Sequence, residues 1–411
     1  MRILNVSGFD IVGATANGYL LHKEYNKRGH DSHMAVLHKL SADHKVHPLG
    51  RKTVNLINSA MARIERRLAL YSVLPSAAFS LHIAPYFRTS EIVHLHLPHV
   101  VPFFSVFNFP LLGIRDNHRV VLSIHDMWMM TGACHYSLDC DHWLTGCGNC
   151  PDLSRTFPLR FDTTSFQWML KKWAMLLSKI TLIVGSDWQY DKVRRSPILS
   201  HLPCHRIPYG ADTSVFKLRN KEKCRSRFNI PQEANVIAFR SVPWRKNFKG
   251  TEYIERALAT LSPDKPTYLL TFEGKGGLDC LRVKYKFVEL GWTNDQDMVA
   301  DALAAADVLL MPSTAEAFGL MAIESMACGT PVIVFEGTAL PQTIRAPHAG
   351  IAVPQDHEAL AQATKTLLDD PDLRHRLADN GRKLVEQEHN VDLYVHRHLA
   401  LYERLLKGDN V

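Results

Sequence analysis

The segment EAFGLMAIE carries two carboxylates, Glu316 and Glu324, with seven residues between them in an otherwise apolar stretch. Carboxylates in such a setting are costly to bury unless a partner compensates them. Gly329 marks a helix C-terminus, so we expect a helix over about 318–328 whose first N–H groups, beside Gly319, can bind a phosphate. The two acids would then suit a sugar nucleotide, one facing the sugar and one accepting from ribose hydroxyls. The alternative is a helix with a favourable acid before its N-terminus and a polar residue on its rim.

The chain length and the order of apolar and amphipathic segments predict the elements that position these acids. The chain has 411 residues, more than one core usually supports. Short apolar runs alternate with amphipathic helical stretches, which predicts parallel sheets with helices on both faces. The pattern is interrupted near 206–218 and then restarts. We therefore expect two doubly wound, Rossmann-like α/β domains facing across a cleft, over 1–205 and 206–390, with a C-terminal helix in 391–411 that packs back on the first domain or docks elsewhere. Ligands of such sheets bind beyond the carboxyl ends of the strands.

Composition narrows the class of protein and its partners. Hydrophobic residues make up 46% and charged residues 22%, as in an ordinary globular protein. The net charge of +7 favours anionic ligands or an anionic membrane surface, but it is too small to indicate a nucleic-acid partner. The N-terminus does not resemble a signal peptide, and the apolar stretch 100–114 is too short and proline-interrupted to span a bilayer. We expect a cytoplasmic protein whose eight cysteines are reduced.

Several segments resemble one enzyme family. PSTAEAFGLMAIESMACGTPVI is similar to the acid-x7-acid signature of the retaining, nucleotide-sugar-dependent glycosyltransferases of family four, which have the GT-B architecture. IPYGADTSVF resembles the interdomain segment of that family, FRSVPWRKNFKG its basic loop, and RILNVSGFDIVGATANG its first strand and loop. VHLHLPH and LSIHDMWMMTGACHYSLDCDHWLTGCGNCPDL resemble a branch that assembles bacterial capsule, exopolysaccharide and O-antigen. The resemblance covers nearly the whole chain.

The resemblance implies roles for residues of the second domain. Glu316 would contact the transferring sugar and Glu324 the ribose, while Arg240 and Lys249 would neutralise the diphosphate, as departure of a nucleoside diphosphate requires. Arg245 or Lys246 could substitute for either base. The remaining donor contacts implied here come from the start of the predicted helix, at Phe318, Gly319 and Leu320. No Asp-x-Asp metal clamp is evident, so we expect no divalent metal in catalysis.

In the first domain the resemblance implies two further contacts. His125 follows the strand VVLSI and matches the family's active-site histidine, which can hydrogen-bond the donor sugar or orient the acceptor. Without the resemblance, His125 would be interpreted as a satisfied core or loop histidine. The loop after the first strand approaches the diphosphate in the family through a Gly-Gly pair, which here reads Gly13-Ala14. The glycine spacing does not match a dinucleotide fingerprint.

Cys134, Cys140, Cys147 and Cys150 form C-x5-C-x6-C-x2-C within one loop. Four thiols so close together in a cytoplasmic protein favour a structural zinc site over disulfides. Free thiols or a redox-labile pair are the alternative.

The segment 51–75 places apolar residues at helical spacing, with Arg63, Arg66 and Arg67 toward the other side. Such a basic amphipathic helix could contact the anionic inner membrane surface, or it could pack on its own domain.

These observations lead us to expect a retaining glycosyltransferase that moves a sugar from a UDP- or GDP-sugar to a saccharide acceptor, lipid-linked in our interpretation, in bacterial surface polysaccharide synthesis. It would be cytoplasmic or peripheral on the inner membrane. The alternatives are a nucleotide-sugar 2-epimerase of the same architecture and an inactive GT-B scaffold subunit.

Overall fold

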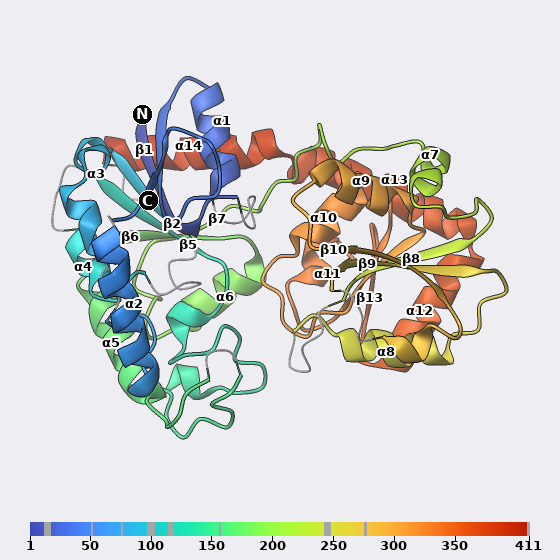
Figure 1. Ribbon diagram of the computed structural model, residues 1–411, viewed down its shortest axis with the longest axis horizontal. Coiled ribbons are helices and arrows are strands. Elements are labelled where there is room, and N and C mark those ends of the chain that lie inside the picture. Colours follow the sequence, from blue (N-terminus) through green and yellow to red (C-terminus); the bar gives the residue numbers. More distant parts are fainter. Residues whose placement is uncertain are drawn as a thin grey trace. The chain divides into compact units, whose positions relative to one another are not determined.

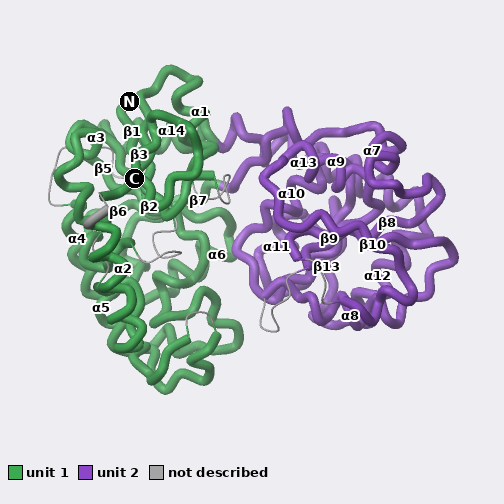
Figure 2. Tube along the Cα trace, viewed as in Figure 1, with its two compact units in different colours: residues 1–207, 395–411 green, residues 208–394 purple. Residues whose placement is uncertain are grey.

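The computed structural model describes residues 1–11, 18–50, 52–74, 77–96, 103–113, 118–155, 158–241, 248–274 and 278–408. The chain divides into two compact units, residues 1–207 with 395–411 and residues 208–394 (Figure 2). Each unit contains a parallel sheet flanked by helices (Figure 1). The prediction of two doubly wound α/β domains is therefore confirmed.

The first unit is built on a seven-stranded parallel sheet with the order β3-β2-β1-β4-β5-β6-β7. Its strands are β1 (Arg2–Phe9), β2 (Asp31–His38), β3 (Val46–Pro48), β4 (Ile92–His96), β5 (Arg119–Ile124), β6 (Ile180–Val184) and β7 (Cys204–Arg206). Its helices are α1 (Tyr19–Lys27), α2 (Lys52–Arg67), α3 (Pro85–Thr89), α4 (Asn108–Leu112), α5 (Thr164–Leu176) and α6 (Asp187–Arg195), with the 3-10 helix η1 (Ala77–Ile83).

The second unit has a six-stranded parallel sheet with the order β10-β9-β8-β11-β12-β13. Its strands are β8 (Asn235–Ser241), β9 (Thr267–Glu273), β10 (Lys286–Gly291), β11 (Val308–Met311), β12 (Val332–Phe335) and β13 (Ile351–Val353). Its helices are α7 (Lys221–Arg227), α8 (Thr251–Thr260), α9 (Gln296–Ala305), α10 (Leu320–Ala327), α11 (Leu340–Thr343), α12 (His357–Asp369) and α13 (Pro371–Glu388). Figure 1 shows α8 and α12 on one side of this sheet and α9, α10 and α13 on the other.

The strand order fixes where a ligand can bind. In each sheet the first strand in sequence lies between the next strand and a later one, β1 between β2 and β4 and β8 between β9 and β11. The chain reverses its direction of winding at that point, and the loops leaving the two neighbouring strands separate to opposite faces. The carboxyl ends of β8 and β11, and those of β1 and β4, are therefore the places where polar loop residues can meet a ligand.

Helix α10 begins two residues later than expected and still has the expected end signals. Gly319 is its N-cap residue, Cys328 its C-cap residue, and Gly329 follows with a φ of 79°. The C-terminal helix α14 (Val391–Lys407) was also expected from the sequence, and its residues from 395 onward belong to the first unit. There the Tyr402 hydroxyl lies 2.6 Å from Nδ1 of His94, and Arg119 Nε donates to the carbonyl of Leu405.

None of the helices in the described part of the chain is both long enough and apolar enough to cross a lipid bilayer.

A buried charge network holds the start of β8 in the second unit. The Asp307 carboxylate, just before β11, accepts from Arg225 Nη2 at 2.9 Å, from Lys221 Nζ at 2.7 Å and from the backbone N–H of Val236 at 2.8 Å. Arg225 is itself buried and also donates to the carbonyl of Ala305. Helix α7 is thereby joined to the two central strands.

Replacing Arg225 should destabilise this unit strongly. In Arg225→Met, a buried carboxylate loses its main charged partner, so we expect the free energy of unfolding to fall by about 3 kcal/mol. Arg227→Met is the matched control, because Arg227 lies on the same helix but is partly exposed in its pair with Asp301, and we expect a loss below about 1 kcal/mol. Urea unfolding of the full chain followed by circular dichroism measures both, and equal losses would contradict the role of Asp307.

Candidate functional site

Two basic side chains follow the central strand of the second unit. Arg240 is the penultimate residue of β8, and its Nη2 donates to the carboxylate of Glu273 at the end of β9. Lys249 lies in the turn before α8, and its Nζ is 2.6 Å from Oε2 of Glu316. Because β8 pairs with both β9 and β11, the two bases and their partners Glu273 and Glu316 gather at the carboxyl ends of these strands.

Backbone contacts hold the loop that carries Glu316. The N–H of Thr314 donates to the carbonyl of Phe248, which joins this loop to the turn before Lys249. The carbonyl of Glu316 accepts from the N–H of Ala339, and the carbonyl of Phe318 accepts from the Thr343 hydroxyl at 2.7 Å. The loop between β11 and α10 is thus fixed to both of its neighbours.

Two glycines allow these loops to approach closely. Gly250 has a φ of 73°, and a Cβ atom there would lie 2.0 Å from the carbonyl oxygen of Pro312. Gly319 has a φ of 98°, and a Cβ atom there would lie 2.3 Å from Cδ2 of Leu340. Both positions combine left-handed backbone with steric contact, so a side chain at either would displace the loop next to the acids.

Glu324 is the fifth residue of α10, and its pKa is shifted from the ordinary value. Burial raises the pKa of Glu324 to about 7, and the positive charge of Arg240 opposes that rise. A carboxyl group in this state can accept a hydrogen bond from a hydroxyl when ionised and donate one when protonated. It is therefore suited to bind a polyhydroxylated ligand beside the two bases.

The structure brings together the predicted residues Arg240, Lys249, Glu316 and Glu324. Gly319 and Leu320 stand at the start of α10, as predicted. Phe318 is buried, and its ring packs at 4.9 Å from the ring of Tyr209 and at 5.5 Å from that of His389. Its side chain therefore positions the loop. Four other predicted or alternative contacts, Gly13, Ala14, Arg245 and Lys246, lie outside the described residues.

Glu273 is a residue of the site that the sequence analysis missed. It ends β9, has a φ of 71° and pairs with Arg240. Its position directly after the apolar run TYLLTF, at the carboxyl end of an expected strand, was a signal that could have identified it.

In the first unit, His125 directly follows β5, and its ring lies 6.2 Å from that of His96 on the neighbouring strand. His94 and His96 are fully buried, and burial holds the pKa of both well below the usual range. His94 contacts the Ser123 hydroxyl at 2.7 Å, and His96 contacts Oδ1 of Asn5 at 3.1 Å. His125 is thus next to two neutral imidazoles.

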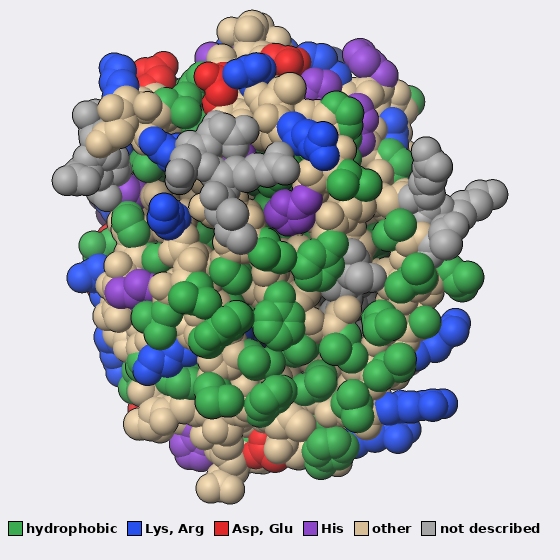
Figure 3. Space-filling view, turned by 90° about the vertical axis from the view of Figure 1, so that its left-hand side faces the viewer, with side chains coloured by type: hydrophobic (Ala, Val, Ile, Leu, Met, Phe, Trp, Pro, Cys, Tyr) green, Lys and Arg blue, Asp and Glu red, His purple; other side chains and the backbone are tan. Residues whose placement is uncertain are grey.

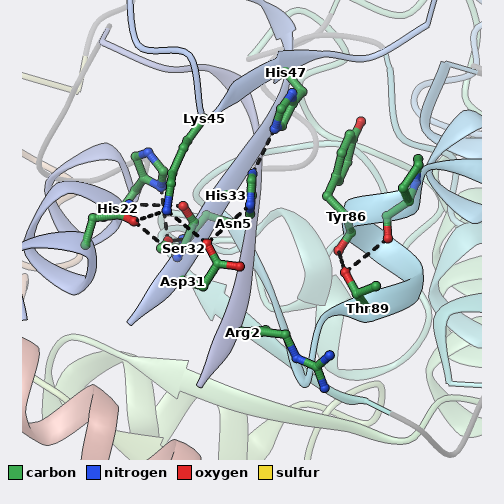
Figure 4. Close-up of polar contacts among 12 residues, drawn as sticks. Arg2, Asn5, His22, Asp31, Ser32, His33, Lys45, His47, Tyr86 and Thr89 are labelled. Atoms are coloured by element: carbon green, nitrogen blue, oxygen red, sulfur yellow. Dashed lines mark hydrogen bonds and ion pairs between the residues drawn. The ribbon is translucent and has the colours of Figure 1, made fainter. Parts of the chain in front are cut away.

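The same polar network crosses to β2. The Asn5 amide donates to the hydroxyl of Ser32, which lies 3.0 Å from Nδ1 of His22 (Figure 4). Burial lowers the pKa of His22 to about 4 although Asp43 is beside it. These contacts fix β1 between β2 and β4 through side chains as well as through the backbone ladder.

The four clustered cysteines line one small cavity, and all are free thiols. The N–H of Gly132 donates to Sγ of Cys147 at 3.2 Å, and burial raises the pKa of that thiol to about 12. Beneath the loop, the fully buried Lys171 donates to three carbonyl oxygens, those of Trp128, Thr131 and Gly132.

Within the described residues, which include all four cysteines, no group of three or more His, Cys, Asp or Glu side chains is arranged to hold a metal ion. The structural zinc site therefore stays a prediction. The loop that follows His125 is held by Lys171 and by the burial of Trp128 and Trp143.

Comparison with known proteins finds a family match within the second unit. Residues 220–384 match the family of glycosyl transferases group 1. This match contains Arg240, Lys249, Glu316 and Glu324.

Curated proteins similar to the chain include glycosyltransferases. The chain is 29% identical over 211 residues to the MMP alpha-(1->4)-mannosyltransferase of Mycolicibacterium hassiacum, covering 49% of this chain and 48% of the relative. It is 33% identical over 176 residues to the GDP-mannose-dependent alpha-(1-6)-phosphatidylinositol dimannoside mannosyltransferase of Mycobacterium tuberculosis, covering 41% of this chain and 45% of that protein. The chain thus spans about half the length of the curated relatives it matches.

Solved structures share the whole fold. Sucrose-phosphate synthase from Thermosynechococcus elongatus superposes with a TM-score of 0.71 and 19% identity, covering 100% of both chains. Anabaena HepE, solved in complex with UDP, superposes with a TM-score of 0.68 and 16% identity over 98% of this chain and 100% of its own. These likenesses establish the two-domain fold of GT-B glycosyltransferases for this chain.

Gly250→Ala should disturb the loop contact. We expect it to lower the free energy of unfolding by more than about 2 kcal/mol, because left-handed strain adds to a clash with the Pro312 carbonyl. Gly337→Ala is the matched control, since Gly337 has a φ of 81° in the same unit but a Cβ atom there meets only the flexible Gln355 side chain at 3.4 Å. The free energy of unfolding of Gly337→Ala should fall by only about 1 kcal/mol. Urea unfolding compares the two, and equal losses would show that the approach to Pro312 is unimportant.

The raised pKa of Glu324 predicts a pH-dependent stability. Between about pH 4.5 and pH 7 the folded protein holds a proton on Glu324 that the unfolded chain has lost, so this group makes the free energy of unfolding fall as pH rises through that window. Glu324→Gln removes this dependence. The free energy of unfolding of the variant, relative to that of the natural protein, should therefore rise by about 2 to 3 kcal/mol as the pH goes from 4.5 to 7.5. Urea unfolding at both pH values measures this difference. Glu233→Gln, at an exposed position, serves as the control, and an equal change in both variants would contradict the raised pKa.

Proposed function

We propose that this chain is a retaining glycosyltransferase, of the family-four type, that transfers a sugar from a nucleotide sugar to a saccharide acceptor. The observation that carries the proposal is the gathering of Arg240, Lys249, Glu316 and Glu324 at the carboxyl ends of β8 and β11, inside the residues that match the glycosyltransferase family. The named donor of one relative, GDP-mannose, and the UDP bound to Anabaena HepE support a nucleotide-sugar donor.

In this proposal the two bases bind the diphosphate. Both are paired with carboxylates in the protein alone, Arg240 with Glu273 and Lys249 with Glu316. A diphosphate carries more negative charge than either partner, so the bases can turn to it without becoming unpaired. Release of Glu316 from Lys249 would then free its carboxylate to accept from hydroxyls of the sugar, and Glu324 would accept from the ribose.

Transfer requires stabilisation of the departing nucleoside diphosphate. As the bond between the anomeric carbon and the phosphate oxygen breaks, charge builds on that oxygen beside Lys249, Arg240 and the first N–H groups of α10. The acceptor hydroxyl attacks from the same face and passes its proton to the departing phosphate oxygen. We propose that the basic pair supplies the charge neutralisation without a divalent metal.

The finer assignments belong to the same proposal. His125, directly after β5, would hydrogen-bond the donor sugar or orient the acceptor, which is a lipid-linked saccharide of bacterial surface polysaccharide synthesis. The structural zinc on the four cysteines would stiffen the loop that follows His125.

Nucleotide binding tests the proposal directly. We expect UDP or GDP to bind the full chain in isothermal titration calorimetry, and Lys249→Ala to weaken that binding about 10-fold to 100-fold, because a charge-assisted hydrogen bond to the diphosphate is lost. Lys383→Ala, at an exposed position of α13, is the matched control and should leave the affinity unchanged.

Two outcomes would reject the proposal. One is that Lys249→Ala binds UDP and GDP as tightly as the natural protein does. The other is that a nucleotide sugar incubated with the chain alone is converted to an isomerised sugar, which would indicate the epimerase.

A further inference from the structure

Large apolar side chains are exposed together on one face of the first unit, which we call the α2–α5 face. Figure 3 shows hydrophobic side chains gathered over its middle and lower parts, with Lys and Arg along one edge. The members of the face are Leu56, Ile57, Ile64 and Leu68 of α2, Phe79 and Ile83 of η1, Phe107 before α4, Phe166, Met169, Trp173 and Leu176 of α5, and Leu177 directly after α5.

Helix α2 presents its apolar stripe outward. Ile57, Ile64 and Leu68 are 47%, 43% and 47% exposed, although an amphipathic helix normally buries such a stripe. The side that is buried instead carries Asn58, Ala62 and Glu65. Asn58 accepts from the N–H of Ala77, and the buried carboxylate of Glu65 accepts from the N–H groups of the chain at 73 and 74. Packing of the apolar stripe on its own domain is therefore wrong for these three side chains.

Helix α5 repeats the arrangement. Phe166, Met169, Trp173 and Leu176 recur at helical spacing and are all about half exposed, while the indole N–H of the buried Trp168 donates to the carbonyl of Trp143. The inward side of α5 is thus already packed.

The two stripes form one surface because the helices are joined at their ends. The carbonyl of Ala69, just after α2, accepts from Nε2 of Gln167 and from the Thr163 hydroxyl at the start of α5. The ring of Phe107 lies 6.0 Å from that of Trp173. A contiguous exposed surface with this many large apolar side chains marks an interaction site.

Charge identifies the kind of partner. The segments 52–89 and 158–179 contain nine Lys or Arg residues and two carboxylates. Both carboxylates are engaged, Glu65 inside the protein and Asp162 with the N–H groups of Cys150 and Thr164. The exposed bases are Arg63, Arg66, Arg67, Arg88, Arg160 and Lys179, with Lys172 partly exposed. A surface that is apolar at its centre and basic along an edge complements an anionic bilayer, whose headgroups attract bases and whose acyl boundary accepts apolar side chains.

We propose that the α2–α5 face binds the surface of an anionic lipid bilayer, with Leu68 and Trp173 inserted below the headgroups and the bases of α2 and α5 against them. This inference does not depend on the proposed function, because it concerns residues of the first unit and is tested without nucleotide or sugar.

Vesicle co-sedimentation of the full chain tests the proposal. We expect binding to vesicles of phosphatidylcholine mixed with phosphatidylglycerol, and weaker binding to phosphatidylcholine alone. Leu68→Ser combined with Trp173→Ser should weaken binding to the mixed vesicles at least about 10-fold, because the inserted apolar area is lost. Arg67→Gln combined with Lys172→Gln should weaken binding to the mixed vesicles about 20-fold. The same variant should bind vesicles of phosphatidylcholine alone as the natural protein does.

The matched control is Val283→Ser combined with Trp292→Ser, two exposed apolar positions of the second unit, and this variant should bind as the natural protein does. Circular dichroism checks that each variant is folded. Unchanged binding of the Leu68–Trp173 variant would overturn the proposal. So would light scattering that shows a dimer of the natural protein which this variant dissociates, because a second copy would then cover the face.

Discussion

The approach of Gly250 to the carbonyl of Pro312 is the constraint on which the candidate site depends. It brings the turn after β8 against the loop after β11, closely enough that no Cβ atom fits between them. Lys249 and Glu316 stand on either side of this contact and pair as a consequence. The parallel sheet supplies the setting, since β8 and β11 are neighbours that send their chains to opposite faces. The contacts of Glu316 with Ala339 and of Phe318 with Thr343 then fix the loop as far as the N-terminus of α10.

Electrostatics at the site are balanced within the protein. Each base already has a carboxylate partner, and Glu324, whose pKa burial raises, lies near Arg240. An anionic ligand would therefore exchange partners with groups that are already ordered, which reduces the conformational entropy lost on binding. This arrangement suits a ligand that carries both a diphosphate and hydroxyl groups.

The first unit combines neutral buried histidines with exposed apolar side chains. Its histidines His94 and His96 are kept neutral by burial and are held by Ser123, Asn5 and Tyr402, so the strand ends near His125 are rigid. Its outer helices α2 and α5 leave several large apolar residues exposed. The interior of the first unit is thus held by polar contacts, and its α2–α5 face is left for a partner outside the protein.

The sequence by itself determined the fold class, because strand–helix alternation and the break near 206–218 admit few other architectures. It also singled out Glu316 and Glu324 by their spacing in an apolar stretch, whereas Arg240 and Lys249 were proposed from the resemblance to the glycosyltransferase family. Only the tertiary structure decided which groups pair. Glu273 and Arg240 are far apart in sequence and meet because β8 and β9 are neighbours. The structure also decided which side of α2 is buried: both the apolar stripe and the arginines are exposed, and the hydrogen bonds made by Asn58 and Glu65 show that the side between them faces inward.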